Sequence, residues 1–336
     1  MARRFRRRDP VTRPLRRSTI SADRSFHLPV TLASLLAALL LDYWRPLDRD
    51  HPLASLFARY ADFLERQFNG GERHQAVVAW ALAVLPVLVA VGVVYLLLAQ
   101  LSGLLAWAWN VLVLYLTVSL QQGNRALAEI EQALRRGDDT QARERLERWR
   151  GETASDLGPG EVARLAIEQG LLEAHRGALA AVFWFVVLPG PIGAVLYRLT
   201  TLIQQRWSRA DGTERAAFAG FAAQAFQVLD WLPARLTAAS FAIVGDFEDA
   251  VYCWQRQAST WLDRNEGIVL ASGAGALGVR LGEPYRRYGE LFYRPELGIG
   301  DEADPDMVAS ARLMIWRVIT LWGGVLLLIA VARWFG

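Results

Sequence analysis

The most constraining feature of the sequence is an almost uninterrupted apolar run over residues 76–120. A helix that crosses a bilayer needs about 20 mostly apolar residues, so this run is long enough for two spans. Gln100, Ser102 and Gly103 form its one polar break. We therefore expect a helical hairpin with a tight turn, in which Pro86 kinks the first helix.

Three later segments extend this pattern. Residues 178–202 are apolar but interrupted by Pro189-Gly190-Pro191, residues 226–244 are moderately apolar, and residues 313–335 are strongly apolar. Residues 28–44 are apolar only up to Asp42, which leaves about 14 residues, too few for an ordinary span. The predicted fold class is all-α: a polytopic transmembrane helical protein with about five spans plus a short re-entrant or interfacial N-terminal helix.

The polar segments define the expected domain organisation. Residues 1–27 carry nine arginines and few apolar residues, and we interpret them as a disordered cytoplasmic tail, with lipid or nucleic-acid docking as the less favoured alternative. Residues 28–336 form a single membrane domain with cytoplasmic helical segments at 121–177 and 246–312. Within the first of these, residues 125–149 have helical periodicity broken at Gly137, which predicts a soluble helix hairpin.

Arginine distribution favours one orientation. All 37 basic residues are arginines. If the first short segment does not cross, residues 1–27, 45–75, 121–177 and 246–312 share one side and hold thirty arginines, against three in residues 203–225. This bias predicts a multi-pass protein of the bacterial inner membrane with the larger side in the cytoplasm. If the first segment crosses, the bias loses its force.

Composition excludes several chemistries. The absence of lysine excludes a Schiff-base nucleophile, a pyridoxal-phosphate anchor and a Walker A lysine. The single cysteine, Cys253, excludes an intramolecular disulfide and a cysteine cluster for zinc. The four histidines lack metalloprotease spacing, and we expect no metal and no cofactor. The lipid bilayer is the expected partner, and the net charge of +3 does not indicate a nucleic-acid binder.

Two motifs admit both a functional and a structural interpretation. Gly273-Ala274-Gly275-Ala276-Leu277-Gly278 satisfies GxGxxG, but the turn-rich sequence after it does not continue a dinucleotide fold. We favour a small-residue helix face that packs closely against another helix. The acids at positions 246, 248 and 249 could bind magnesium, but acids at a helix start more often stabilise the helix dipole.

Asp230 and Arg235 lie in a moderately apolar segment, on either side of Pro233. Ionisable groups at membrane depth are costly, so they mark either a ligand pathway or an internal ion pair. A structural Asp230–Arg235 pair and a ligand site are equally compatible with this sequence.

The sequence of residues 181–202 and of residues 227–247, which contains LPAR at 232–235, closely resembles the AmpE family of bacterial inner-membrane proteins, associated with regulation of β-lactamase induction. It also resembles the related CobD/CbiB family of cobalamin biosynthesis. The CobD/CbiB likeness lies in LDYW with Asp42, in His51-Pro52 and FLE ending at Glu65, and in GALGVRLGEP at 275–284 with RYGE and ARLM. It covers nearly everything after residue 26. CobD/CbiB proteins join adenosylcobyric acid to an aminopropanol moiety in an ATP-dependent amide-forming step.

Departures from the synthase pattern shape what the resemblance implies. A polar segment before the third apolar span keeps Glu168 and Gly177, but its central Glu-Asn pair falls on Leu172 and Glu173 and its last acid on Arg176. Further acids fall on residues 226, 227 and 270, which are Phe, Gln and Leu. Phosphate chemistry needs metal held by carboxylates, so these losses together predict a site that no longer runs the reaction.

The resemblance therefore implies a catalytically degenerate regulatory or sensory protein, whose partner would be a membrane or cell-wall-recycling protein. The alternative is an active cobalamin-biosynthesis enzyme, an adenosylcobinamide(-phosphate) synthase of the CobD/CbiB type, and a structural scaffold is a third class. In each case the synthase-like positions expected to line a ligand cavity are His51, Glu168, Asp230 and Arg235.

Overall fold

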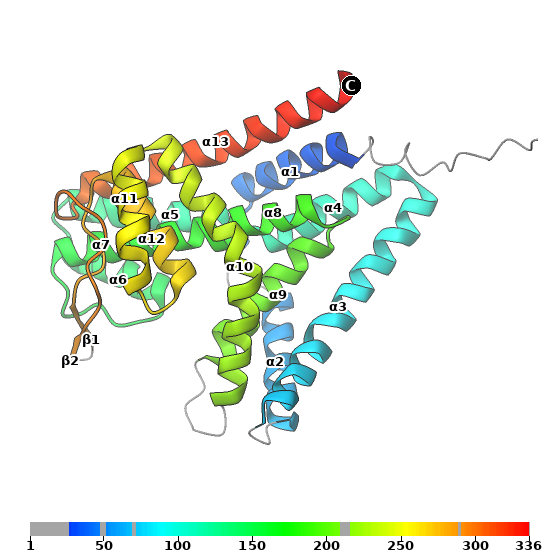
Figure 1. Ribbon diagram of the computed structural model, residues 1–336, viewed down its shortest axis with the longest axis horizontal. Helices are drawn as coiled ribbons and strands as arrows, with labels where there is room; N and C mark the ends of the chain where they lie inside the picture. Colours follow the sequence, from blue (N-terminus) through cyan, green and yellow to red (C-terminus); the bar gives the residue numbers. More distant parts are fainter. Residues whose placement is uncertain (1–26, 48–51, 69–71, 209–215, 288–289, 336) are drawn as a thin grey trace, which may run out of the picture.

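The computed structural model describes residues 27–47, 52–68, 72–208, 216–287 and 290–335. Almost all of the regular structure in these ranges is helical (Figure 1). The elements are α1 (His27–Trp44), α2 (Pro52–Phe68), α3 (Arg73–Leu101), α4 (Gly103–Thr117), α5 (Leu120–Arg135), α6 (Asp139–Arg150), α7 (Pro159–Ala174), the π-helical turn η1 (His175–Leu179), α8 (Ala180–Val187), α9 (Ile192–Trp207), α10 (Ala216–Val244), α11 (Phe247–Gln257), the 3-10 turn η3 (Ala258–Thr260), α12 (Arg264–Leu277), β1 (Tyr285–Arg287), β2 (Glu290–Phe292) and α13 (Pro305–Phe335).

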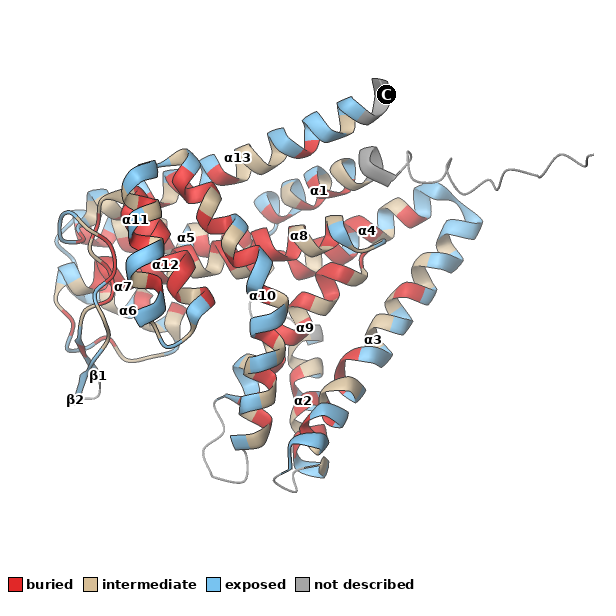
Figure 2. Cartoon of the chain, in the orientation of Figure 1, coloured by how far each residue is buried: buried red, intermediate tan, exposed pale blue. Residues whose placement is uncertain are grey.

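Among the described residues, four helical stretches are long and apolar enough to cross a membrane: Arg73–Leu101, Gly103–Arg135, Pro159–Val187 and Pro305–Ala332. Only 11% of the most apolar part of α3 is buried within the protein. Its outward side chains, such as Leu85, Val89 and Leu96, are more than half exposed. Figure 2 shows the same exposure along α13. Such large apolar surfaces require lipid around them, so the predicted all-α, multi-pass membrane fold is confirmed.

The expected hairpin over residues 76–120 is present as α3 and α4. Ser102 alone separates the two helices, and its hydroxyl accepts a hydrogen bond from the Leu104 amide at 3.2 Å, which caps α4. Such a cap satisfies one of the free amides at a helix start. α3 and α4 diverge from this turn as the two arms of a V (Figure 1).

The structure differs from the sequence prediction in where later spans begin and end. Residues 178–202 are not one helix, because α8 ends at Val187 and the Pro189-Gly190-Pro191 turn starts α9. Instead, α7, η1 and α8 join into one long helical stretch, so part of the segment expected in the cytoplasm belongs to a candidate span. α1 is a continuous short helix that lies alongside α13 (Figure 1).

The polar segments form a lobe at one end of the molecule. The predicted helix hairpin is present as α5 and α6, with Gly137 in the left-handed turn between them and Asp138 capping α6, although α5 also continues the candidate span that begins at Gly103. α11, α12 and the β1–β2 ribbon, in which Tyr285 pairs with Phe292, complete the lobe. Asp246 caps α11 by accepting a hydrogen bond from the Asp249 amide at 3.0 Å. This confirms the helix-start interpretation of that acidic cluster.

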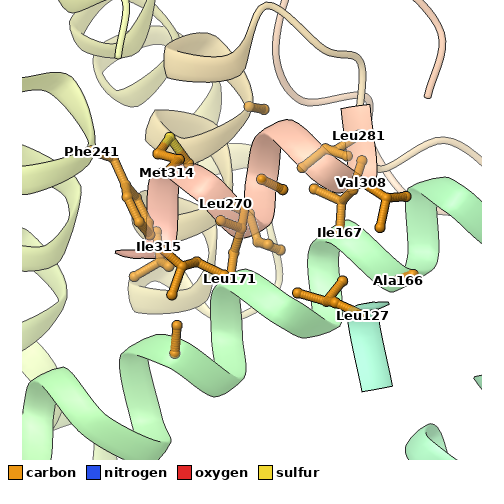
Figure 3. Packing of buried hydrophobic residues seen from close by; sticks show 14 of the residues in the cluster. Leu127, Ala166, Ile167, Leu171, Phe241, Leu270, Leu281, Val308, Met314 and Ile315 are labelled. Carbon is orange, nitrogen blue, oxygen red and sulfur yellow. The ribbon is translucent and has the colours of Figure 1, made fainter. Parts of the chain in front are cut away.

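The main core lies where α7, α10, α12 and α13 meet. Leu171, Phe241, Leu270, Met314 and Ile315 pack together there (Figure 3). The GxGxxG motif belongs to α12, as its structural interpretation predicted. A Cβ at Gly273 would lie 2.7 Å from a Leu171 methyl carbon, and one at Gly275 would lie 2.4 Å from the Asp249 carbonyl oxygen. These glycines therefore allow α12 to approach α7 and α11 closely.

Candidate functional site

The three predicted site residues that the structure describes do not form one cluster. His51 lies outside the described residues. Glu168 is buried on α7, Asp230 is buried on α10, and Arg235 lies half-exposed one turn further along α10. We describe the surroundings of Glu168 first, then those of Asp230 and Arg235.

Glu168 holds a loop that is distant in sequence. Its carboxylate accepts two hydrogen bonds from the Arg294 guanidinium, at 2.6 and 3.1 Å, and a third from the Gly282 amide at 2.9 Å. Arg294 also donates to the Gly282 carbonyl at 2.9 Å. Bidentate guanidinium–carboxylate contacts are among the strongest and most directional polar interactions in proteins. Glu168 therefore fixes the end of the GALGVRLGEP segment against α7.

Glu283, the residue after Gly282 in the GALGVRLGEP loop, is also held in place. Glu283 has a φ of 58°, a left-handed conformation that non-glycine residues seldom adopt, and it follows Gly282 at 77°. The Arg164 guanidinium, one helical turn before Glu168, forms an ion pair with the Glu283 carboxylate. Arg294 lies over the rings of Tyr285 and Trp261, at 4.7 and 5.3 Å from their centroids. Such strained backbone persists where surrounding contacts determine it, and it occurs often at functional sites.

Asp230 pairs with a histidine rather than with Arg235. Its Oδ1 lies 2.9 Å from His175 Nε2 and accepts a hydrogen bond from the Tyr197 hydroxyl at 2.7 Å. His175 Nδ1 lies 2.9 Å from the Thr237 hydroxyl, so both ring nitrogens are engaged. His175, Tyr197, Asp230 and Thr237 are almost completely buried. Of the two alternatives that the sequence left open, the Asp230–Arg235 ion pair is therefore not formed, because a buried imidazole and phenol already satisfy the carboxylate.

His175 opens the π-helical turn between α7 and α8. π-turns inside α-helices are rare and frequently occur at functional sites. Here the turn lies where the polar end of the long helix meets its apolar end.

Arg235 and Arg176 both contact residues of the first turn of α12. Arg235 donates to the Trp231 carbonyl at 2.6 Å, reaches Asn265 Oδ1 at 3.4 Å, and lies 4.2 Å from the centroid of the Trp231 ring. Arg176 forms an ion pair with Glu266, the residue after Asn265. An arginine thus stands where the synthase pattern has an acid, and α12 supplies a carboxylate beside it.

Asp263, at the start of α12, is an acid whose pKa is changed by its surroundings. Asp263 caps α12 by accepting hydrogen bonds from the Asn265 and Glu266 amides, at 2.9 and 3.2 Å. Burial, reinforced by the nearby Glu266 carboxylate, raises the pKa of Asp263 above its usual value. Among the described residues no group of three or more His, Cys, Asp or Glu side chains is arranged to hold a metal ion.

Sequence reasoning missed several members of these clusters. Arg294, Tyr197 and Glu266 were not selected as site residues, and their partners are between 33 and 126 residues away. Of the residues quoted for the family resemblance, Asp42 is buried and accepts a hydrogen bond from the Gln121 amide at 2.9 Å. Asp42 thereby joins the end of α1 to the start of α5.

The fold and these clusters define a helical, multi-pass membrane protein with a polar lobe. Buried ion pairs engage an acid of α7, Glu168, and an acid of α10, Asp230. A sequence model of the CobD/Cbib protein family matches residues 35–315, and the chain belongs to that family. It is 39% identical over 303 residues to a cobalamin biosynthesis protein CobD of Stutzerimonas stutzeri, covering 88% of this chain and 96% of the relative.

Two further relatives carry the same name. A CobD of Chromobacterium violaceum is 37% identical, with 75% of each chain covered. A CobD of Mycobacterium tuberculosis is 30% identical over 85% of this chain and 90% of its own. No solved structure matches. These relatives support the cobalamin-biosynthesis alternative and do not support the regulatory interpretation or its AmpE association.

Proposed function

We propose that this chain is a membrane-bound cobalamin-biosynthesis enzyme of the CobD/CbiB type, which joins adenosylcobyric acid to an aminopropanol moiety with ATP. The supporting observation is the fixation of the GALGVRLGEP loop by Glu168 and Arg294, together with relatives named CobD over nearly the full chain. The loop is part of the family resemblance, and a buried bidentate pair holds it in place. Such rigid support is what a site needs to orient reactants.

We propose different roles for the predicted site residues. Glu168 and Asp230 are buried and engaged by several donors, so we assign them to positioning the loop and α10. Arg235 is half-exposed, and its guanidinium is suited to an anionic group of a substrate. Glu266 places a carboxylate next to Arg176, where the synthase pattern has an acid. The replacement at position 176 is therefore a weaker argument against activity.

We place the protein in the bacterial inner membrane with the polar lobe in the cytoplasm. Residues 121–177 and 246–312, which contain most of that lobe, hold 9 and 7 arginines. Arginine-rich loops are retained on the cytoplasmic side of bacterial membranes. ATP is a cytoplasmic reactant, so this orientation also suits the proposed chemistry.

A second candidate is a regulatory protein that has lost the reaction. Leu270 stands where the synthase pattern has a glutamate, and it is buried in the main core. An apolar residue packed in this way cannot bind a metal-bound phosphate.

Complementation separates the two candidates. We would express the chain in a strain that lacks its own cobinamide synthase and measure cobalamin-dependent growth. The proposed function predicts that growth is restored, and that Arg235→Gln reduces it while protein abundance is unchanged. No rescue by a chain that is present in the membrane would refute the synthase and favour the regulatory protein.

A further inference from the structure

Two cavities adjoin each other beside the junction of α4 and α5. One has a volume of about 480 Å³ and a polar lining that includes Arg125, Arg145 and Arg148. The other, of about 470 Å³, lies between α2, α3, α4 and α9 and is lined mostly by apolar side chains. Leu47 and Gln122 line both cavities. The two spaces therefore meet at these residues.

The lining changes in polarity along one stripe of the chain. Val113, Leu116 and Ser119 line the apolar cavity, Gln122 lines both, and Arg125 lines the polar one. Val113 and Leu116 belong to α4, Ser119 lies in the short connection after it, and Gln122 and Arg125 belong to α5, so the lining continues across the junction of the two helices. The stripe thus passes from apolar through neutral polar to cationic. A ligand that follows it must have an apolar part and an anionic part.

The lining of the polar cavity has more cationic than anionic groups, with three arginines and the carboxylate of Glu129. Arg145 is paired with Glu129 at 2.6 Å. Arg148 has only a 4.0 Å contact with Glu144, in which both side chains are 62% exposed. The structure gives Arg125 no ion pair within the described ranges. Arg125 acts on the buried Asp42 carboxylate only at longer range, so among the described residues both guanidinium groups keep hydrogen-bond donors for an anion.

We propose that these joined cavities bind an anionic glycerophospholipid, with its phosphate against Arg125 and Arg148 and an acyl chain in the apolar cavity. Guanidinium groups bind phosphate oxygens in a directional, two-pronged geometry. A hydrocarbon chain gains free energy by leaving water for an apolar lining. A free phosphate or a nucleotide would match the arginines but would leave the apolar cavity without a role. This proposal stands independently of the proposed function.

The first test measures headgroup selectivity. The full chain, purified in a mild detergent, is incubated with phosphatidylglycerol or with phosphatidylcholine of the same acyl chains, and bound lipid is counted by native mass spectrometry. We expect phosphatidylglycerol to be retained preferentially. Arg125→Gln and Arg148→Gln should each weaken its binding about fivefold, which corresponds to about 1 kcal/mol per arginine.

The matched control for these variants is Arg143→Gln. Arg143 lies on α6 like Arg148, has an equally long contact of 4.0 Å with Asp139, and is absent from the lining of both cavities. It should bind phosphatidylglycerol as the wild type does. Equal retention of the two lipids, or equal losses in Arg143→Gln and Arg148→Gln, would overturn the proposal.

The second test concerns the apolar part. Leu116→Trp, or the smaller Leu116→Phe, should fill the cavity and reduce lipid binding, whereas Leu112→Trp should not, because Leu112 lies on the same helix but is 45% exposed. Excess inorganic phosphate or ATP should not displace the lipid. Displacement by either compound, with binding unchanged in both Leu116 variants, would overturn the proposal in favour of a soluble phosphate compound.

Discussion

The guanidinium of Arg294 donates two hydrogen bonds to the carboxylate of Glu168, 126 residues earlier in the chain. Their side chains are only 10% and 3% exposed. Removing one partner of such a pair leaves a buried charge without compensation, at a cost of about 3–5 kcal/mol. We expect Arg294→Gln to reduce the free energy of unfolding by that amount, measured by denaturant titration in detergent.

The control for this prediction is an exposed ion pair of the same lobe. Arg280 contacts Glu302 at 3.2 Å, with side chains 36% and 85% exposed. Pairs of this kind contribute less than about 1 kcal/mol. Arg280→Gln should therefore unfold almost as the wild type does, and an equal loss in both variants would contradict the assigned importance of the Glu168–Arg294 pair.

Asp230→Ala should destabilise the protein through His175 and Tyr197. It removes the common acceptor of two buried groups, at 2.9 and 2.7 Å, and each stranded polar group costs about 1–3 kcal/mol. Tyr197→Phe removes one of these bonds and should cost about 1 kcal/mol. Arg235→Ala should leave the cluster intact. Thermal unfolding of the three variants provides the comparison, and an Arg235→Ala loss as large as that of Asp230→Ala would restore the rejected ion pair.

Cys253 provides a test of core burial. It is fully buried on α11, and burial raises the pKa of its thiol to about 11. Because the thiolate is the nucleophile, only about 0.1% of such thiols are reactive at about pH 8. We expect very slow alkylation by iodoacetamide in detergent and fast alkylation after unfolding in SDS. Raising the pH toward 11 should increase the native rate, and rapid labelling at pH 8 would show that α11 is not packed as described.

Substitution of two helical glycines by alanine should have opposite effects. At Gly275 an added Cβ would lie 2.4 Å from the Asp249 carbonyl oxygen, so α11 and α12 must separate. At Gly220, on α10, no atom lies within 4 Å of the added Cβ. Gly220→Ala should therefore stabilise the protein by up to about 1 kcal/mol, and Gly275→Ala should destabilise it. Melting temperatures of both variants test the prediction: that of Gly220→Ala should rise and that of Gly275→Ala should fall relative to the wild type.

Membrane orientation can be tested with reporters fused after Ala311, at the polar start of α13. If the polar lobe is cytoplasmic, a cytoplasmic reporter at this point should be active and a periplasmic one silent. The reverse pattern would contradict the orientation that the arginines of residues 121–177 and 246–312 predict.

The fold was predictable from the sequence where one physical signal dominated. Bilayer length identified α3, α4 and α13, and helical periodicity with a Gly137 break identified the α5–α6 hairpin. Bilayer length did not predict the helix boundaries at residues 178–202. There, hydropathy does not change at the Pro-Gly-Pro turn, whereas the backbone does, and the preceding helix extends back to Pro159.

The site was less predictable because its pairs join residues that are distant in sequence. Glu168 could be selected from the family resemblance and Asp230 as a costly acid in an apolar segment, but nothing local indicates that their partners are Arg294 and His175. Asp230 and Arg235 are five residues apart, and proximity in sequence suggested a pair. On α10, however, Arg235 lies beside Asn265 and Asp230 beside His175. Tertiary packing, and not proximity in sequence, therefore determines the partners of Asp230 and Arg235.

The turn at Ser102 has a consequence for how the chain is made. Only this one residue separates α3 from α4, so no polar segment has to be translocated between them. α3 is long and apolar enough to span a membrane on its own, whereas α4 has 15 residues and reaches spanning length only together with α5. We therefore expect that charged residues inserted into this turn, which would have to cross the bilayer with the hairpin, would impair membrane insertion.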